Sequence, residues 1–360
     1  MRPGKIIVGL ILLCGTSFAQ NFSPQKDIVF GQVAAGGDYE TVITLTNRGT
    51  QTYDGTLKFY QGEGKDWNPA VNGTPISDGK IPVSIPAGAT VTYHVTGSGL
   101  LAGFACVMAF GQAQTNFVEG NLTYLIRSGA ALVDSVGVPP STEFYLSAIP
   151  FEDFSRIALA LANGDSTNKT AKVTLTLYSE TNANLGSTDL SLGPSWHTPK
   201  FLSQFFPSAQ LSKGRIEIVS DIPIFGTALT LFSGQFSSLP LLPSQRAYTF
   251  VASAPDGMNF SGDASIWAEG PFVKGYIRVT TYNGSPMSAA PYLLYGRLIN
   301  GTLMLFTWAN TAPYVYQEGT MYLKIENFSF ATNSYTTDWI ATSVPDVQSG
   351  RGRITLTRVH

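Results

Sequence analysis

Short segments in which apolar and polar residues alternate run along almost the whole chain. From Val42 to Thr46 the apolar side chains of Ile43 and Leu45 share one parity, and a polar turn then leads to a second alternating segment, "TLKFY". A period of two is the pattern of a β-strand with two different faces. Turn signals recur roughly every ten residues and helical periodicity is almost absent, so the pattern predicts an all-β protein of antiparallel strands.

The pattern occurs twice. The stretch "ITLTNRGTQTYDGTLKFY" at 43–60 is matched by "LALANGDSTNKTAKVTLTLY" at 159–178, where the flanking alternation persists and the turn changes. Further on, "SIPAGATVTYHV" from Ser84 corresponds to "SLGPSWHTPKFL" from Ser191. Turns are where related domains vary without disturbing a core. We therefore predict two tandem antiparallel β-sandwiches, residues 21–140 and a repeat of that unit at 141–246.

Two features distinguish the copies. Phe201, Leu202, Phe205 and Phe206 stand at helical spacing in the second copy, which predicts a short helix there. The first copy contains an insertion at 61–80 that the second lacks. The junctions "GVPPST" and "LLPSQ" are short and contain proline, which favours a semi-rigid string of domains.

The remaining residues, 247–360, do not repeat the pattern but are again rich in alternating segments. Asn300-Gly301 lies between two of them and predicts a type I′ hairpin, because both residues accept a positive φ. We expect a third, aromatic-rich β-domain, a meander of six to eight strands folded as a barrel or a sandwich.

The N-terminus has the features of a signal peptide at 1–19. Arg2 and Lys5 precede a short apolar run, and Ser17 and Ala19 place small residues before a cleavage site after Ala19. A lipoprotein signal using Cys14 is the alternative, although Leu13 occupies the position where a small residue is needed. No later segment reaches the ~20 apolar residues of a membrane-spanning helix. We expect a protein that is secreted or held at the cell surface, with no transmembrane segment after cleavage.

The two repeated units also resemble a known group of domains. The phrases "TVITLTNRGTQTYDGTLKFYQ", "SIPAGATVTY" and "VDSVGVPPS", with "IPFEDFSRIALALAN" and "HTPKFLSQFFP" in the second unit, resemble tandem immunoglobulin-like β-sandwich domains of secreted, mostly uncharacterised bacterial proteins. The resemblance covers about residues 22–246. It implies an exported protein with structural or binding modules, and it supplies neither catalytic residues nor a ligand.

Composition excludes some functions. Only 13% of the residues are charged and the formal net charge is −2, so no basic stripe is present to bind nucleic acid. After signal cleavage Cys106 is the only cysteine, which rules out an intramolecular disulfide. Its apolar context, "FACVMAF", predicts a buried strand.

No catalytic or cofactor motif stands out. His94, His197 and His360 have no second ligand at metal-binding spacing, so we expect neither a metal nor a cofactor. Ser195-Trp196-His197 does not form a nucleophile and base, because neighbours on an extended chain point to opposite faces. We interpret it as a turn with Trp196 packed inward.

The leading hypothesis is a non-catalytic, structural or adhesion-type protein that binds an unknown protein or polysaccharide outside the cell. The first alternative is carbohydrate binding by aromatic residues of the C-terminal domain. A second alternative is a glycoside-active enzyme whose two carboxylates, Asp263 and Glu269, flank Trp267. The candidate carbohydrate-binding residues are Trp267, Trp308, Tyr314, Tyr316 and Trp339.

Overall fold

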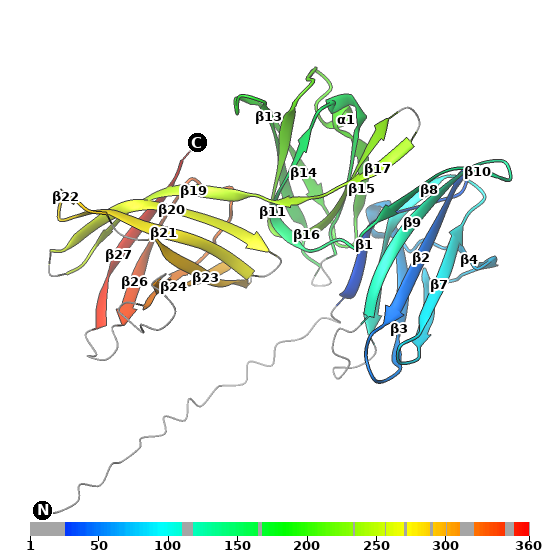
Figure 1. Ribbon diagram of the computed structural model, residues 1–360, viewed down its shortest axis with the longest axis horizontal. Helices are drawn as coiled ribbons and strands as arrows, with labels where there is room; N and C mark the ends of the chain where they lie inside the picture. The colour runs from blue at the N-terminus through cyan, green and yellow to red at the C-terminus, as the bar shows by residue number, and fades with distance from the viewer. Residues whose placement is uncertain are drawn as a thin grey trace, which may run out of the picture.

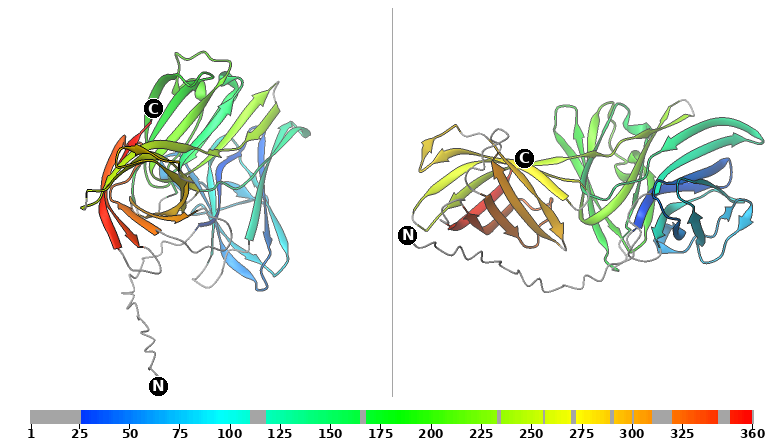
Figure 2. Two further views of the ribbon diagram at one scale, coloured as in Figure 1. Left: turned by 60° about the vertical axis from the view of Figure 1, so that its left-hand side comes forward. Right: turned by 60° about the horizontal axis from the view of Figure 1, so that its bottom comes forward.

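A computed structural model describes the chain over residues 26–109, 118–164, 168–232, 235–255, 257–269, 272–288, 291–299, 301–309, 320–342 and 349–359. The predicted signal peptide lies outside these residues. The described part is almost entirely β-strand, which confirms the predicted all-β class. Its strands form three bodies in a row, with two-sheet bodies first and second and a barrel third (Figures 1 and 2).

The first sandwich packs two antiparallel sheets around one apolar core, which includes Ile43, Leu45, Leu57 and Phe59. One sheet has the order β1 (Lys26–Ala35), β8 (Leu101–Ala109), β3 (Tyr53–Gln61) and β6 (Lys80–Ile85). The other has the order β10 (Ala131–Val138), β9 (Val118–Ser128), β2 (Tyr39–Asn47), β7 (Thr90–Thr96), β4 (Ala70–Val71) and β5 (Thr74–Pro75). The insertion at 61–80 supplies a 3₁₀ turn, η1 (Gly62–Gly64), and the short strands β4 and β5, of which β4 pairs with β7.

The second sandwich is organised around one long strand, β16 (Gly214–Phe232), which belongs to both of its sheets. The first half of β16 pairs with β11 (Phe144–Phe151) and β13 (Ala171–Ser179), and β13 continues to β14 (Asn184–Leu192). The second half pairs with β12 (Ile157–Ala162) and β17 (Gln235–Leu239), and β12 continues to β15 (His197–Phe201). The smaller elements are η2 (Phe154–Arg156), β18 (Leu242–Pro243) and the predicted short helix, which the structure confirms as α1 (Leu202–Phe205).

The same strand pairing recurs in the two sandwiches. In the first sandwich β2 pairs with β7 and β3 pairs with β6. In the second sandwich the corresponding pairs are β12 with β15 and β13 with β14. A buried asparagine recurs as well: Asn47 Nδ2 donates to the carbonyls of Gln51 and Ile85 at 2.7 and 2.9 Å. Asn163 Nδ2 donates to those of Lys169 and Leu192, both at 2.9 Å. Each amide therefore ties its polar turn to the facing sheet. The domain boundaries predicted from the sequence, after residues 140 and 246, stay predictions.

The third body is a closed barrel of eight strands, so the meander takes the barrel form. Consecutive strands pair antiparallel, and the last strand pairs back with the first. At the predicted hairpin Ile299 lies opposite Thr302, and Gly301 has a φ of +76°. The strands are β19 (Gln245–Ser253), β20 (Asn259–Glu269), β21 (Phe272–Tyr282), β23 (Tyr292–Ile299), β24 (Thr302–Ala309), β25 (Thr320–Ile325), β26 (Ser334–Thr342) and β27 (Ser349–Arg358), with β22 (Ser285–Pro286) paired to β21.

Apolar side chains fill the barrel interior, as expected for a barrel of this strand number. Several inward positions, Gly275 and Gly296 among them, are glycine because neighbouring strands approach closely there. A Cβ at Gly275 would lie 2.1 Å from the Ser265 carbonyl oxygen, and one at Gly296 would lie 1.8 Å from that of Met304. These close approaches let the sheet bend into a closed ring. With the interior packed, the outer wall is the barrel's accessible surface.

Removing the recurrent amide should destabilise its sandwich. Asn47→Ala leaves the buried Ile85 carbonyl and the part-buried Gln51 carbonyl without their donor, so we expect a loss of about 2 kcal/mol in the free energy of unfolding. Thr46→Ala is the control, because the Thr46 hydroxyl bonds only to the exposed Thr90 hydroxyl at 2.9 Å. Denaturant titration measures both variants, and equal losses would contradict the role of Asn47.

Candidate functional site

A buried ion pair joins the second sandwich to the barrel. Arg246, on β19, donates through Nη1 to Glu217 Oε2 on β16, and the two side chains are only 6% and 3% exposed. Arg246 Nε also donates to the Phe330 carbonyl at 3.3 Å. The second carboxylate oxygen, Oε1, accepts from the Tyr178 hydroxyl at 3.5 Å. The two charges come from different bodies, so each body buries a charge that only the other neutralises.

Apolar contacts surround this ion pair. Tyr145 and Leu146 on β11 and Val219 on β16 belong to the same buried cluster as the barrel interior. From the barrel side Phe328 and Phe330 join that cluster, with ring centroids 5.0 Å apart. The second sandwich thus covers one end of the barrel.

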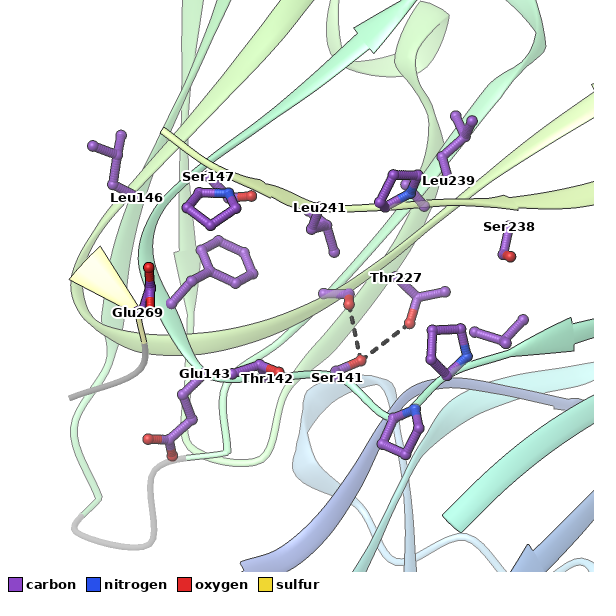
Figure 3. Close-up of a pocket in the computed structure, with 18 of the residues that line it drawn as sticks. Ser141, Thr142, Glu143, Leu146, Ser147, Thr227, Ser238, Leu239, Leu241 and Glu269 are labelled. Carbon is purple, nitrogen blue, oxygen red and sulfur yellow. Dashed lines mark hydrogen bonds between the residues drawn. The ribbon is translucent and has the colours of Figure 1, made fainter. Parts of the chain in front are cut away.

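A pocket of about 440 Å³ lies where the linker between the two sandwiches, residues 139–143, meets the second sandwich and the barrel (Figure 3). We call it the junction pocket. Its lining combines prolines and leucines with hydroxyl groups and the carboxylates of Glu143 and Glu269. Ser141 holds the linker in place, since its Oγ donates to the Gly226 carbonyl at 2.9 Å and accepts from the Gly31 amide at 3.1 Å. The first sandwich therefore also positions this pocket.

An aromatic and apolar surface covers part of the outer wall of the barrel. The side chains of Tyr295 and Phe306 are 47% and 42% exposed, although both are large and apolar in body. The Phe306 and Tyr322 ring centroids are 5.1 Å apart, and Phe272 stacks on Tyr295 at 6.2 Å. We call this surface the aromatic face: Phe272, Tyr276, Leu293, Tyr295, Phe306, Tyr322 and Ile340.

Strand register brings four residues of the aromatic face into one row. Tyr295 lies opposite Phe306, Phe306 opposite Tyr322, and Tyr322 opposite Ile340 on four successive strands. Cross-strand partners share a face of the sheet and lie about 5 Å apart. In the other direction Tyr295 lies opposite Lys274, and Lys274 opposite Trp267.

The row ends at the junction pocket. Trp267 Nε1 donates to Glu269 Oε1 at 3.1 Å, and Lys274 Nζ forms an ion pair with Glu269 Oε2. Glu269 is also one of the pocket's lining residues. The aromatic face and the junction pocket are therefore parts of one continuous surface.

The structure separates the predicted aromatic residues. Trp267 is partly exposed on the outer wall, whereas Trp339 is 6% exposed and belongs to the buried interior cluster. The wall of the barrel thus lies between them, and they do not form one platform. Trp308 lies on β24 opposite Leu293, but its side chain is outside the described part, as are Tyr314 and Tyr316 altogether.

Sequence reasoning missed the residues of the row. Tyr295, Phe306 and Tyr322 come from three strands with different spacing along the chain, and only the register aligns them. The sequence did contain one signal that could have placed Tyr295. Leu294 and Leu298 stand at even positions of their strand and point into the barrel, so Tyr295, at an odd position, points outward.

The two acids of the enzyme hypothesis are both paired with cations. Asp263 Oδ1 accepts from Arg278 Nη2 at 3.0 Å. The ion pair with Lys274 and the hydrogen bond from Trp267 lower the pKa of the Glu269 carboxyl. A glycosidase needs one carboxyl group with a raised pKa as its general acid. The environment of Glu269 lowers its pKa instead, and Asp263 is held in an ion pair with Arg278.

The Ser195-Trp196-His197 segment lies at the seam between the two sandwiches. The inward packing predicted for Trp196 is wrong: this side chain is 39% exposed and its indole covers Gly193. His197 is the buried residue, 5% exposed, with its ring 6.3 Å from that of Phe104. Cys106 is fully buried in the same seam, as predicted.

The His197 ring sits in an apolar environment. Neither ring nitrogen reaches hydrogen-bond geometry, although the Gly31 backbone lies nearby. Burial lowers the pKa of the imidazole to about 4. The neutral ring is therefore the form that fits this seam.

Comparisons of the chain with protein-family models, with curated proteins and with solved structures gave no match. The resemblance to immunoglobulin-like modules stays a prediction. Within the described residues no helix has the length and apolar character to cross a membrane. The same residues contain no group of three or more His, Cys, Asp or Glu side chains arranged to hold a metal ion.

Breaking the buried ion pair should loosen the barrel from the second sandwich. Arg246→Ala leaves Glu217 buried and unpaired, so we expect a loss of about 3–5 kcal/mol, measured by denaturant unfolding. The double variant Glu217→Leu with Arg246→Met removes both charges and should lose clearly less. A single variant as stable as the wild type would contradict the role assigned to the pair.

The His197 environment predicts a pH dependence of stability. The pKa is lower in the folded protein than in the unfolded chain, so protons bind preferentially to the unfolded chain between about pH 6.5 and 4. Stability should fall across this window as the pH drops, by about 3 kcal/mol in total. His197→Leu should flatten the dependence in thermal unfolding at several pH values. An unchanged slope in that variant would show that other groups cause it.

Proposed function

We propose that the protein is a non-catalytic, adhesion-type protein of the cell exterior that binds polysaccharide on the aromatic face. The observation that carries this proposal is the row of rings on adjacent strands, in which Tyr295 and Phe306 are exposed and Tyr322 is partly exposed. A folded protein gains nothing in its own stability from leaving large rings in water, and such patches mark binding sites.

The chemistry of the face suits a sugar chain. Aromatic rings offer flat surfaces on which the CH groups of a sugar ring stack, and the Tyr hydroxyls remain available for hydrogen bonds. The cationic groups at one edge, Lys274 and Arg297, are themselves occupied: Lys274 pairs with Glu269, and the Arg297 guanidinium lies 5.0 Å from the Phe272 ring centroid. A neutral chain therefore fits the row better than a strongly charged one.

The curvature of the barrel narrows the class of ligand. The row crosses four strands of a closed ring of eight, so its rings point in progressively different directions. A flat crystalline surface would touch only one or two of them. A flexible single chain in solution bends with the wall and contacts the whole row.

The rest of the molecule suits a rigid support for this surface. The Ser141 contacts hold the first sandwich on the second, and the Glu217–Arg246 pair holds the second sandwich on the barrel. Export by the predicted signal peptide would place this support outside the cell. The pairing of Asp263 and Glu269 with cations gives the glycosidase alternative no support.

Truncating the rings should weaken polysaccharide binding. Tyr295→Ala and Phe306→Ala each remove a stacking surface, and we expect each to lower affinity roughly tenfold, equivalent to about 1.4 kcal/mol. Affinity electrophoresis in soluble xylan, amylose and glucomannan measures this effect. Pull-down with microcrystalline cellulose should retain little protein.

Val251→Ala is the matched control. Val251 is 62% exposed on β19, on the wall of the barrel opposite β24, and its truncation should change affinity less than twofold. A wild-type protein that binds none of the soluble polysaccharides would refute the proposed ligand class. Capture of a protein partner that needs the same rings would replace polysaccharide with protein as the ligand.

A further inference from the structure

The junction pocket lies at the end of the aromatic row. From Tyr295 the row continues through Lys274 to Trp267, and Trp267 bonds to Glu269 at the pocket's edge. Phe272, the first residue of β21, lies opposite Glu269 and stacks on Tyr295. A chain that follows the rings toward β20 therefore reaches the pocket without leaving the surface.

The lining of the pocket alternates apolar and polar groups. Pro140, Pro240 and Leu241 contribute CH surfaces, while Thr142 and Ser238 contribute hydroxyl groups. The carboxylates of Glu143 and Glu269 lie toward one end of the pocket in Figure 3. A sugar ring presents the same combination, with CH groups on its faces and hydroxyl groups around its rim.

We propose that the junction pocket binds the terminal sugar of the polysaccharide chain that lies on the aromatic face, an inference that rests on the proposed function. The two carboxylates can accept hydrogen bonds from the hydroxyl groups of a sugar, and the oxygens of Glu269 do so beside their existing bonds to Trp267 and Lys274. The terminal unit is therefore a hexose or a pentose, in keeping with the neutral chain proposed for the aromatic face.

The architecture favours a chain end over the middle of a chain. The pocket is formed between the linker residues 139–143 and the segment 240–243, with parts of β11 and β16 in its lining. The second sandwich also covers the end of the barrel, so the surface stops there. A chain coming from the open aromatic face meets this sandwich and ends in the pocket.

Titration calorimetry with hexasaccharides and long chains of xylan, amylose and glucomannan tests the inference. We expect one protein bound per chain end at both chain lengths. Thr142→Trp places an indole in the pocket and should lower affinity for the hexasaccharide at least tenfold. Glu143→Gln keeps the shape of the side chain but removes its charge, and it should lower the affinity for the hexasaccharide several-fold. This second variant tests the pocket even if the tryptophan variant fails to fold.

The control is Thr249→Trp, which adds the same side chain on the outer wall of β19, away from the pocket. This variant should bind the hexasaccharide as the wild type does. Unchanged hexasaccharide affinity in both pocket variants, or a number of bound proteins that rises with chain length, would overturn the chain-end inference and leave the proposed function standing. Absence of binding to any carbohydrate by the wild type would overturn both.

Discussion

The ion pair between Glu217 and Arg246 is the contact on which the docking of the barrel against the second sandwich depends. Each charge is almost completely buried, and each lies on a different body. In the docked arrangement a buried charge without its partner costs several kcal/mol, so each of the two residues requires the other there. Docking in turn brings Glu269 to the linker and completes the junction pocket. The pocket and the aromatic face are therefore held in a fixed relation, which a flexible string of domains would not give.

The fold was predictable from the sequence as far as local patterns determine it. Alternation revealed the strands, and the repeat placed Asn47 and Asn163 at the same position of their turns, where both make the same pair of contacts. Closure of the barrel was not predictable, because β19 and β27 pair across nearly the whole domain. The ion pair was also hidden, since Glu217 stands among apolar residues of β16 and nothing in its neighbourhood indicates the partner.

The candidate site shows where residue type misleads. The sequence suggested the largest rings, yet Trp339 faces the interior and Trp267 the solvent. The direction of a side chain on a closed sheet follows its parity relative to the core, and ring size does not decide it. Tyr295 and Phe306 were predictable as exposed residues once the inward leucines beside them were recognised. Their alignment depends on register, which hairpin geometry and barrel closure set.

The central claim is that the aromatic face is the surface that contacts the ligand. Hydroxyl-radical footprinting with mass spectrometry, in the presence and absence of a soluble polysaccharide that binds, measures the exposure of each ring directly. The account predicts several-fold protection of Tyr295 and Phe306, with no change at Phe232, which is 61% exposed on the second sandwich. Binding that leaves Tyr295 and Phe306 as reactive as in the ligand-free protein would contradict it.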